Sequence, residues 1–221
     1  MKEKITTAKK CYMQYGAGPY GPDAWKNFDI SPTLRLQRLP LVGFIFRNFE
    51  PLFSPTIRYG DIVKGLPIAE GSCNGVYCAH VLEHLALDDF RVALKNTYRY
   101  MVPNGTFRFV LPDLECYVKD YVARCPDPQA SMDFLRLTYL GHNSRRKGLL
   151  GLLRTWIGNS SHLWMWDYYS MSHELSAAGF TSIRRAYFGD EEDSMFHLVE
   201  EERMFEKGLG IECKKPALSS I

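Results

Sequence analysis

The chain has 221 residues, long enough for one domain whose core needs no disulfide or metal to stabilise it. Hydrophobic residues make up 46% of the sequence and charged residues 24%, a composition that excludes a disordered, collagen-like or coiled-coil protein. The formal net charge of +2 lacks the basic excess typical of nucleic-acid-binding proteins, so we expect no nucleic-acid partner.

The cysteines and the apolar stretches bear on the location of the protein. None of the six cysteines forms a C-x-x-C pair and most lie in apolar runs, which favours free thiols in a reducing compartment. The first ten residues are polar and lysine-rich, unlike a signal peptide. The longest apolar stretch, Leu41 to Phe53, contains Arg47 and Glu50 and is shorter than the ~20 residues of a membrane span. We therefore expect a soluble, cytoplasmic protein.

Short apolar runs alternate with segments of helical periodicity. The first predicted strands cover Cys11 to Gly16, Trp25 to Ile30 and Thr56 to Tyr59. A strand over Cys73 to Ala79 then leads into a helical face from Val81 to Met101, where apolar residues recur every three or four positions. The remaining predicted elements are a strand over Phe107 to Leu111, a mostly helical stretch over Asp113 to Ala178, and strands over Ser182 to Phe188 and Leu209 to Lys214.

This alternation predicts an α/β fold in which helices cover both faces of a mostly parallel sheet. No segment is rich enough in Gly, Pro or Ser to act as a linker. We therefore expect a single domain over residues 1–221, with residues 113–169 as a helical elaboration that covers a substrate pocket.

Polar motifs follow the first four predicted strands, and ligands of open parallel sheets bind at the carboxyl ends of strands. Glycines in Gly16-Ala17-Gly18 permit close approach of the backbone to a ligand, although the motif is also an ordinary turn. Asp29 is placed to accept ribose hydroxyls, or else to cap a turn. Asp61-Ile62 suits an adenine ring and its amino group, and Cys78-Ala79-His80 ends the fourth strand.

Six segments resemble, in collinear order, the class I S-adenosylmethionine-dependent methyltransferases, and within them the type 11 group. These segments are DIVKGLP (61–67), NGVYCAHVLEHL (74–85), MVPNGT (101–106), VLPDL (110–114), AGFTSI (178–183) and IECKK (211–215). The resemblance implies a Rossmann-like sheet of seven strands with a reversed final hairpin and a helical insertion between the fifth and sixth strands. It also implies S-adenosylmethionine as cofactor, bound by Gly16, Ala17, Gly18, Asp29, Asp61, Ile62, Ala79 and His80.

The sequence departs from the family pattern near its first strand. Gln14 stands where the family usually has an acidic residue, and Pro19-Tyr20 replaces its third glycine. Gly18 and Asp29 are 11 positions apart, whereas a crossover between parallel strands needs a dozen or more residues. Either the first helix is reduced to a loop or the first two strands are placed wrongly.

The run His80-Val81-Leu82-Glu83-His84 has a rival interpretation. H-x-x-E-H is an inverted zinc-protease motif, which places two histidines on one helical face. Some relatives of the resembling group bind a divalent ion through an E-x-x-E-H version of this segment. The third interpretation, in which Glu83 and His84 hydrogen-bond neighbouring loops and no metal binds, is the one that we adopt.

A second cluster, Ser161 to Tyr169, combines titratable and aromatic side chains. We expect an acceptor pocket there, lined by His142, Trp164, Trp166 and Tyr169. His80 and His162 are candidate bases, because a hydroxyl acceptor must lose a proton. The alternative is an aromatic cluster that packs a helical cap onto the sheet.

The sequence thus predicts an S-adenosylmethionine-dependent methyltransferase that acts on a small molecule or a sugar. Residues 145–157 are basic at one end and apolar after it, which suits a lid helix or weak contact with a membrane surface. The alternatives are a catalytically inactive S-adenosylmethionine-binding regulatory module and a metal-dependent hydrolase that uses His80 and His84.

Overall fold

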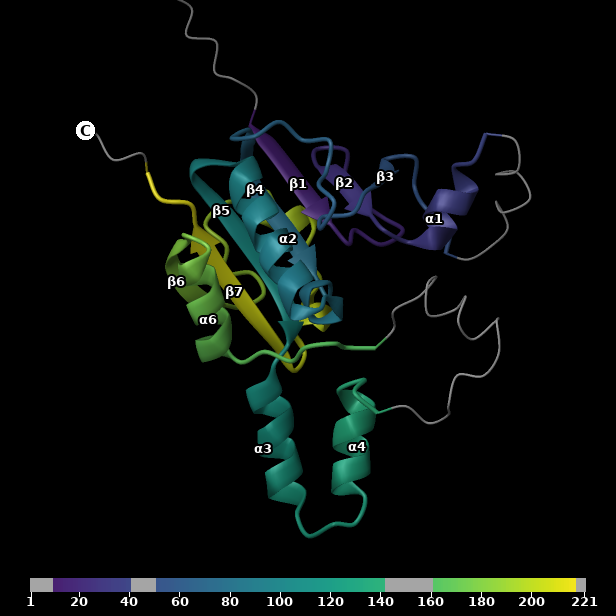
Figure 1. The fold of residues 1–221 in the computed structure, drawn as a ribbon, viewed down its shortest axis with the longest axis vertical. Helices are drawn as coiled ribbons and strands as arrows, with labels where there is room; N and C mark the ends of the chain where they lie inside the picture. Colours follow the sequence, from purple (N-terminus) through teal and green to yellow (C-terminus); the bar gives the residue numbers. More distant parts are fainter. Residues whose placement is uncertain (1–9, 41–50, 142–160, 218–221) are drawn as a thin grey trace, which may run out of the picture.

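The computed structural model describes residues 10–40, 51–141 and 161–217, which form a seven-stranded sheet (Figure 1). The strand order is β3-β2-β1-β4-β5-β7-β6, and only β7 runs antiparallel to its neighbours. This confirms the predicted fold class. The strands are β1 (Cys11–Tyr15), β2 (Lys26–Asp29), β3 (Ile57–Tyr59), β4 (Cys73–Ala79), β5 (Met101–Pro112), β6 (Thr181–Ala186) and β7 (Gly208–Lys214).

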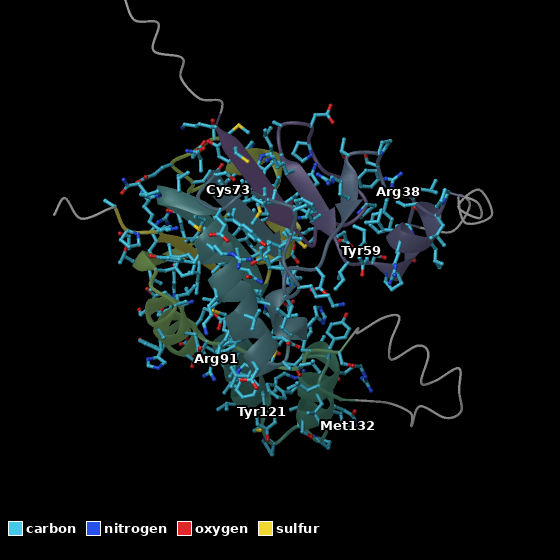
Figure 2. The ribbon with its side chains drawn as sticks, turned by 45° about the horizontal axis from the view of Figure 1, so that its top comes forward. Arg38, Tyr59, Cys73, Arg91, Tyr121 and Met132 are labelled. Atoms are coloured by element: carbon cyan, nitrogen blue, oxygen red, sulfur yellow. The ribbon has the colours of Figure 1, made fainter. Side chains whose placement is uncertain are left out.

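Two helices cover one face of the sheet, α2 (Leu87–Tyr100) and α6 (Tyr168–Ala177). The buried residues of α2 include Phe90, Ala93, Leu94 and Thr97, whose spacing of three and four puts them on one side of the helix. Alternate residues of the strands, such as Met13 and Tyr15 of β1, meet these helices in the main core. An exposed bidentate ion pair from Arg91 of α2 to Glu174 of α6 links the two helices; Figure 2 labels Arg91.

The opposite face has less helix. The short α1 (Pro32–Gln37) packs through Leu34 against Ile57 of β3. Elsewhere on this face, a small cluster of Tyr12, Trp25, Tyr77 and Phe196 covers β1 and β4. Helices on both faces are therefore present, in reduced form on this side.

The connection between β1 and β2 is a loop. The two strands pair in parallel, with Met13 opposite Lys26, and no helix forms over residues 16–25. Of the two alternatives that the sequence left open, the reduction of the first helix to a loop is therefore the correct one.

The segment between β5 and β6 extends from the carboxyl edge of the sheet. Its first part is a hairpin of α3 (Leu114–Arg124) and α4 (Ala130–Leu137), whose Tyr121 and Phe134 rings lie 5.9 Å apart. Figure 2 shows Tyr121 and Met132 on this hairpin, at the end of the molecule opposite Cys73 of β4. Within the described ranges, no helix is long and apolar enough to cross a membrane.

A buried arginine connects the second face of the sheet to the segment before β7. Arg108 of β5 is fully buried, and its guanidinium contacts carboxylates of Glu200, Glu212 and Asp190. It also donates to the carbonyl of Tyr187 at 2.7 Å. Removing one member of such a network leaves the other charges buried and unpaired.

We therefore predict that Arg108→Met lowers the free energy of unfolding by about 3–5 kcal/mol, the usual cost of breaking a buried ion pair. Urea denaturation monitored by circular dichroism measures this loss. The matched control is Arg203→Met, because Arg203 is exposed in its pair with Glu201 and should leave the midpoint almost unchanged. Equal midpoints for the two variants would contradict a stabilising role for the network.

Candidate functional site

A cavity of about 760 Å³ lies where the first four strands end, a size typical of small-molecule sites. Six of the predicted cofactor residues line it: Gly16, Gly18, Asp29, Asp61, Ile62 and His80. Ala17 and Ala79 are not among the described lining residues. Their side chains pack on the second face of the sheet, Ala17 against the Leu34 cluster and Ala79 against the Trp25 cluster, so only their backbone is available to a ligand.

The glycine loop has a fixed shape for steric reasons. Gly16 has a φ of +69°, in the left-handed region that glycine favours. A Cβ added there would lie 2.1 Å from the Cγ2 atom of Val81, which also lines the cavity. Gly18 also has a positive φ, and its backbone N–H donates to Asp29 Oδ2 at 2.9 Å. The loop that follows β1 is thereby tied to the end of β2.

Gln14 stands where the family usually has an acidic residue, and it supports this loop through Asn27. Its Nε2 donates to Asn27 Oδ1 at 2.8 Å in a buried contact between β1 and β2. Asn27 in turn donates to the carbonyls of Pro22 and Trp25. The amide pair therefore satisfies backbone groups of the loop that replaces the first helix.

Asp29 and Asp61 are oriented by the backbone around them. Asp29 Oδ1 accepts from the N–H of Ser31 at 2.7 Å, in addition to the bond from Gly18. Asp61 Oδ1 accepts from the N–H of Val63 at 2.9 Å. Each ionised carboxylate oxygen can accept more than one hydrogen bond, so both groups keep capacity for ligand hydroxyl or amino groups.

The His80 to His84 segment differs from the helix expected there. His80 has a φ of +51°, Leu82–His84 form a single 3-10 turn, and α2 begins only at Leu87. The two histidines therefore do not share a helical face, and the inverted zinc-protease geometry is absent from this segment. The hydrolase alternative loses its structural basis.

His80 is held at both ring nitrogens. Nδ1 lies 3.2 Å from Glu83 Oε1, and Nε2 lies 3.1 Å from the carbonyl oxygen of Met204. Burial lowers the pKa of His80, but the hydrogen bond and the charge of Glu83 outweigh burial, so its pKa is raised above the usual value. Both ring nitrogens therefore face oxygen atoms, and the role of His80 as a general base stays a prediction.

Glu83, His84 and His162 meet beside the cavity. One potential ligand atom from each residue lies within 4.8 Å of the others. His84 lines the cavity, whereas His162 lies behind it, with ring centroids 5.0 Å apart. Burial lowers the pKa of His162 and favours its neutral form. His162 is not among the described lining residues, so it is not placed to take a proton directly from a ligand there.

Of the aromatic segment, Leu163 lines the cavity, although the sequence did not single it out. Trp164 is 41% exposed and Tyr169 is 77% exposed. Trp166, expected in an acceptor pocket, is instead buried in the core, where its ring packs 4.4 Å from that of Phe90. His142 and residues 145–157 lie outside the described residues.

Tyr15 also lines the cavity and was missed. Its hydroxyl is buried, 3.2 Å from Thr97 Oγ1. Tyr15 is the last residue of β1, directly before the glycine loop. Its place at a strand end is the signal that could have predicted its contact with the cavity.

The burial of Trp166 leads to a prediction with an internal control. Trp166→Ala should lower the free energy of unfolding by about 3–5 kcal/mol, as expected for removing a large aromatic side chain from a core. Trp164→Ala, two positions away and half-exposed, should change it little. Urea denaturation of both variants measures the difference. A larger loss of unfolding free energy for Trp164→Ala than for Trp166→Ala would contradict the burial of Trp166 in the core.

Comparison with known proteins shows which proteins the chain resembles. Residues 17–109, less than half of the chain, match the family model of a methyltransferase domain. No curated protein sequence matches significantly. The fold is similar to that of a chain described as a methyltransferase in complex with the Trm112 methyltransferase activator from Haloferax volcanii, with a TM-score of 0.51, 14% identity, and coverage of 96% of this chain and 85% of that one.

Two further solved structures are similar to a lesser degree. A SAM-dependent methyltransferase from Archaeoglobus fulgidus has a TM-score of 0.49 and 14% identity, over 93% of this chain and 86% of that one. One from Methanosarcina mazei has a TM-score of 0.49 and 13% identity, over 96% and 95%. The matched domain contains the second glycine of the loop, both aspartates and the His80 turn. Over residues 17–109 the chain is therefore similar to a methyltransferase domain, and its overall fold is similar to that of the solved methyltransferase chain with the TM-score of 0.51.

Proposed function

We propose that the protein binds S-adenosylmethionine in the cavity and transfers its methyl group to a small molecule or a sugar. The observation that carries this proposal is the convergence of the glycine loop, Asp29 and Asp61 on one cavity at the carboxyl edge. Ligands of open α/β sheets bind at this edge.

The residues of the cavity suit the parts of this cofactor. Gly16 and Gly18, which need no space for a side chain, would lie under the methionine part. Asp29, at the end of β2, would accept the ribose hydroxyls. Asp61 would accept from the adenine amino group, and Ile62 would cover the ring. His80, with its ring fixed, would stand near the methionine part.

The cofactor supplies an electrophilic methyl group on a good leaving group, so the protein contributes mainly by positioning the acceptor. On the acceptor side, His84 and Leu163 form the cavity wall, and the backbone N–H groups of Leu163 and Trp164 both donate to the carbonyl of Glu83. We propose that residues 113–169 set the choice of acceptor, with Trp164 and Tyr169 as exposed candidates for contact. His162 would act through His84, whose ring it contacts.

The binding assignments lead to a calorimetric prediction. S-adenosylhomocysteine should bind the wild-type protein at one site, and Asp29→Asn and Asp61→Asn should each weaken binding about 10- to 100-fold. Hydrogen bonds to charged groups contribute about 1.5–3 kcal/mol, which corresponds to that range. Asp120→Asn is the control, because Asp120 pairs with Lys207 away from the cavity. Absence of binding at millimolar ligand, by a folded protein, would rule out the proposed cofactor.

A second candidate function is an inactive S-adenosylmethionine-binding module. It is favoured by Gln14, whose amide is committed to Asn27 where the family usually has an acid. Cofactor binding without methyl transfer to any compound in a broad panel of hydroxyl, amine and carbon acceptors would support this module. Measured turnover would exclude it, and turnover is the outcome that we expect. Cytoplasmic location, and weak membrane contact through residues 145–157, remain predictions from the sequence.

A further inference from the structure

We propose that Glu83, His84 and His162 form a binding site for a divalent transition-metal ion at the wall of the cavity. One ligand atom from each of the three side chains lies within 4.8 Å of the other two. Two imidazoles and one carboxylate are a donor set that zinc and other first-row divalent ions favour. The proposal concerns these side chains alone and holds whether or not the cavity binds the proposed cofactor.

The carboxylate provides the first argument. Glu83 is completely buried, and its Oε1 atom faces Nδ1 of His80 at 3.2 Å. Within the part of the chain that the structure describes, its Oε2 atom has no hydrogen-bond partner. A buried carboxylate oxygen without a partner is costly, because it has lost water and gained nothing in exchange. A bound cation would supply the missing interaction.

The two histidines provide the second argument. His84 Nδ1 lies 3.1 Å from the carbonyl of Ser161, and its Nε2 lies on the side of Glu83, 3.9 Å from Oε1. His162 is 9% exposed, and its Nδ1 has no partner among the described residues.

Glu83 is therefore held through Oε1 and leaves Oε2 for a cation, and His84 is held through Nδ1 with its Nε2 on the side of Glu83. Histidines that ligate metals usually donate their other ring N–H to a carbonyl or carboxylate, which fixes the tautomer and orients the ring. The carbonyl of Ser161 stands in that position for His84, and His80 fixes Glu83 in the same way. This second layer of hydrogen bonds distinguishes the cluster from a chance grouping of polar side chains.

The dimensions and the surroundings also suit a metal ion. Ligand atoms about 2.1 Å from a common tetrahedral ion are separated by about 3.4 Å, so small side-chain rotations would close the present spacing. Three protein ligands leave at least one coordination position open. Because His84 lines the cavity, an oxygen ligand from water or from an acceptor hydroxyl could complete the shell from that side.

Metal binding to the purified full-length protein tests this proposal. The protein, without a histidine tag, is stripped with EDTA and titrated with ZnCl₂ by calorimetry, and the metal content after dialysis is measured by elemental analysis. We expect one zinc ion per chain. Glu83→Gln and His162→Asn should each weaken binding at least about tenfold, whereas His173→Asn, on the exposed surface of α6, should leave the affinity unchanged.

Cobalt provides a readout that reports on the ligands. CoCl₂ added to the stripped protein should give a visible absorption band of low-coordinate Co²⁺ with nitrogen ligands, and His162→Asn should alter or abolish it. Circular dichroism and thermal unfolding of the stripped variants identify any loss that is due to misfolding. For a variant that fails to fold, zinc-dependent thermal stabilisation of the wild type, absent from Glu83→Gln, replaces the affinity measurement.

Several outcomes would overturn the proposal. One is no zinc or cobalt binding by the folded wild-type protein. Another is binding that survives both ligand variants but is lost in His173→Asn, which would assign the ion to the surface. Zinc binding and S-adenosylhomocysteine binding are measured separately, so failure of one leaves the other conclusion standing.

Discussion

The buried amide pair between Gln14 and Asn27 is the interaction on which the site depends most. The loop over residues 16–25 replaces a helix, so its backbone groups cannot satisfy each other within a helix. Asn27 accepts from Gln14 and donates to the carbonyls of Pro22 and Trp25, which fixes the loop to both strands. With the loop fixed in this way, the backbone N–H of Gly18 donates a hydrogen bond to Asp29. An acid in place of Gln14 would have no proton to donate to Asn27 Oδ1, which explains in physical terms why the amide stands here.

A second constraint joins the two halves of the chain at the cavity. The segment that returns from the α3–α4 hairpin is held by the carbonyl of Glu83, which accepts from both Leu163 and Trp164. It is held again where Trp166 pairs with Asp113 in a short parallel bridge. The first half of the chain thus supplies the glycine loop, the aspartates and His84, and the second half contributes Leu163 to the opposite wall. Because the wall and the glycine loop come from segments far apart in the sequence, residues of the wall can change without disturbing the loop.

The sequence predicted the residues at the strand ends correctly, but it did not predict the start of α2 or which aromatic side chains are buried. Asp29, Asp61 and His80 could be brought together in advance, because parallel strands end at one edge of a sheet. The start of α2 was predicted too early. The spacing of Val81, Leu82 and Leu85 is compatible with an α-helical face, but in the structure a 3-10 turn over Leu82–His84 precedes the helix. Trp166 was misassigned because nothing local shows which ring of an aromatic run meets Phe90. The approach of His162 to Glu83 likewise depends on the path of the chain between them.

The charges around the cavity divide in a way that suits methyl transfer. Asp29 and Asp61 line the side proposed for the cofactor, where negative charge favours a cationic sulfonium ligand. Beside the other wall, the carboxylate of Glu83 is completely buried and lies 3.2 Å from the ring of His80. A divalent ion held there by one carboxylate and two neutral imidazoles would carry a net single positive charge. Such a centre favours an ionised oxygen over a neutral one, because a bound metal lowers the pKa of its oxygen ligands. The electron-rich atom and the electrophilic methyl group would then each face a wall of opposite charge.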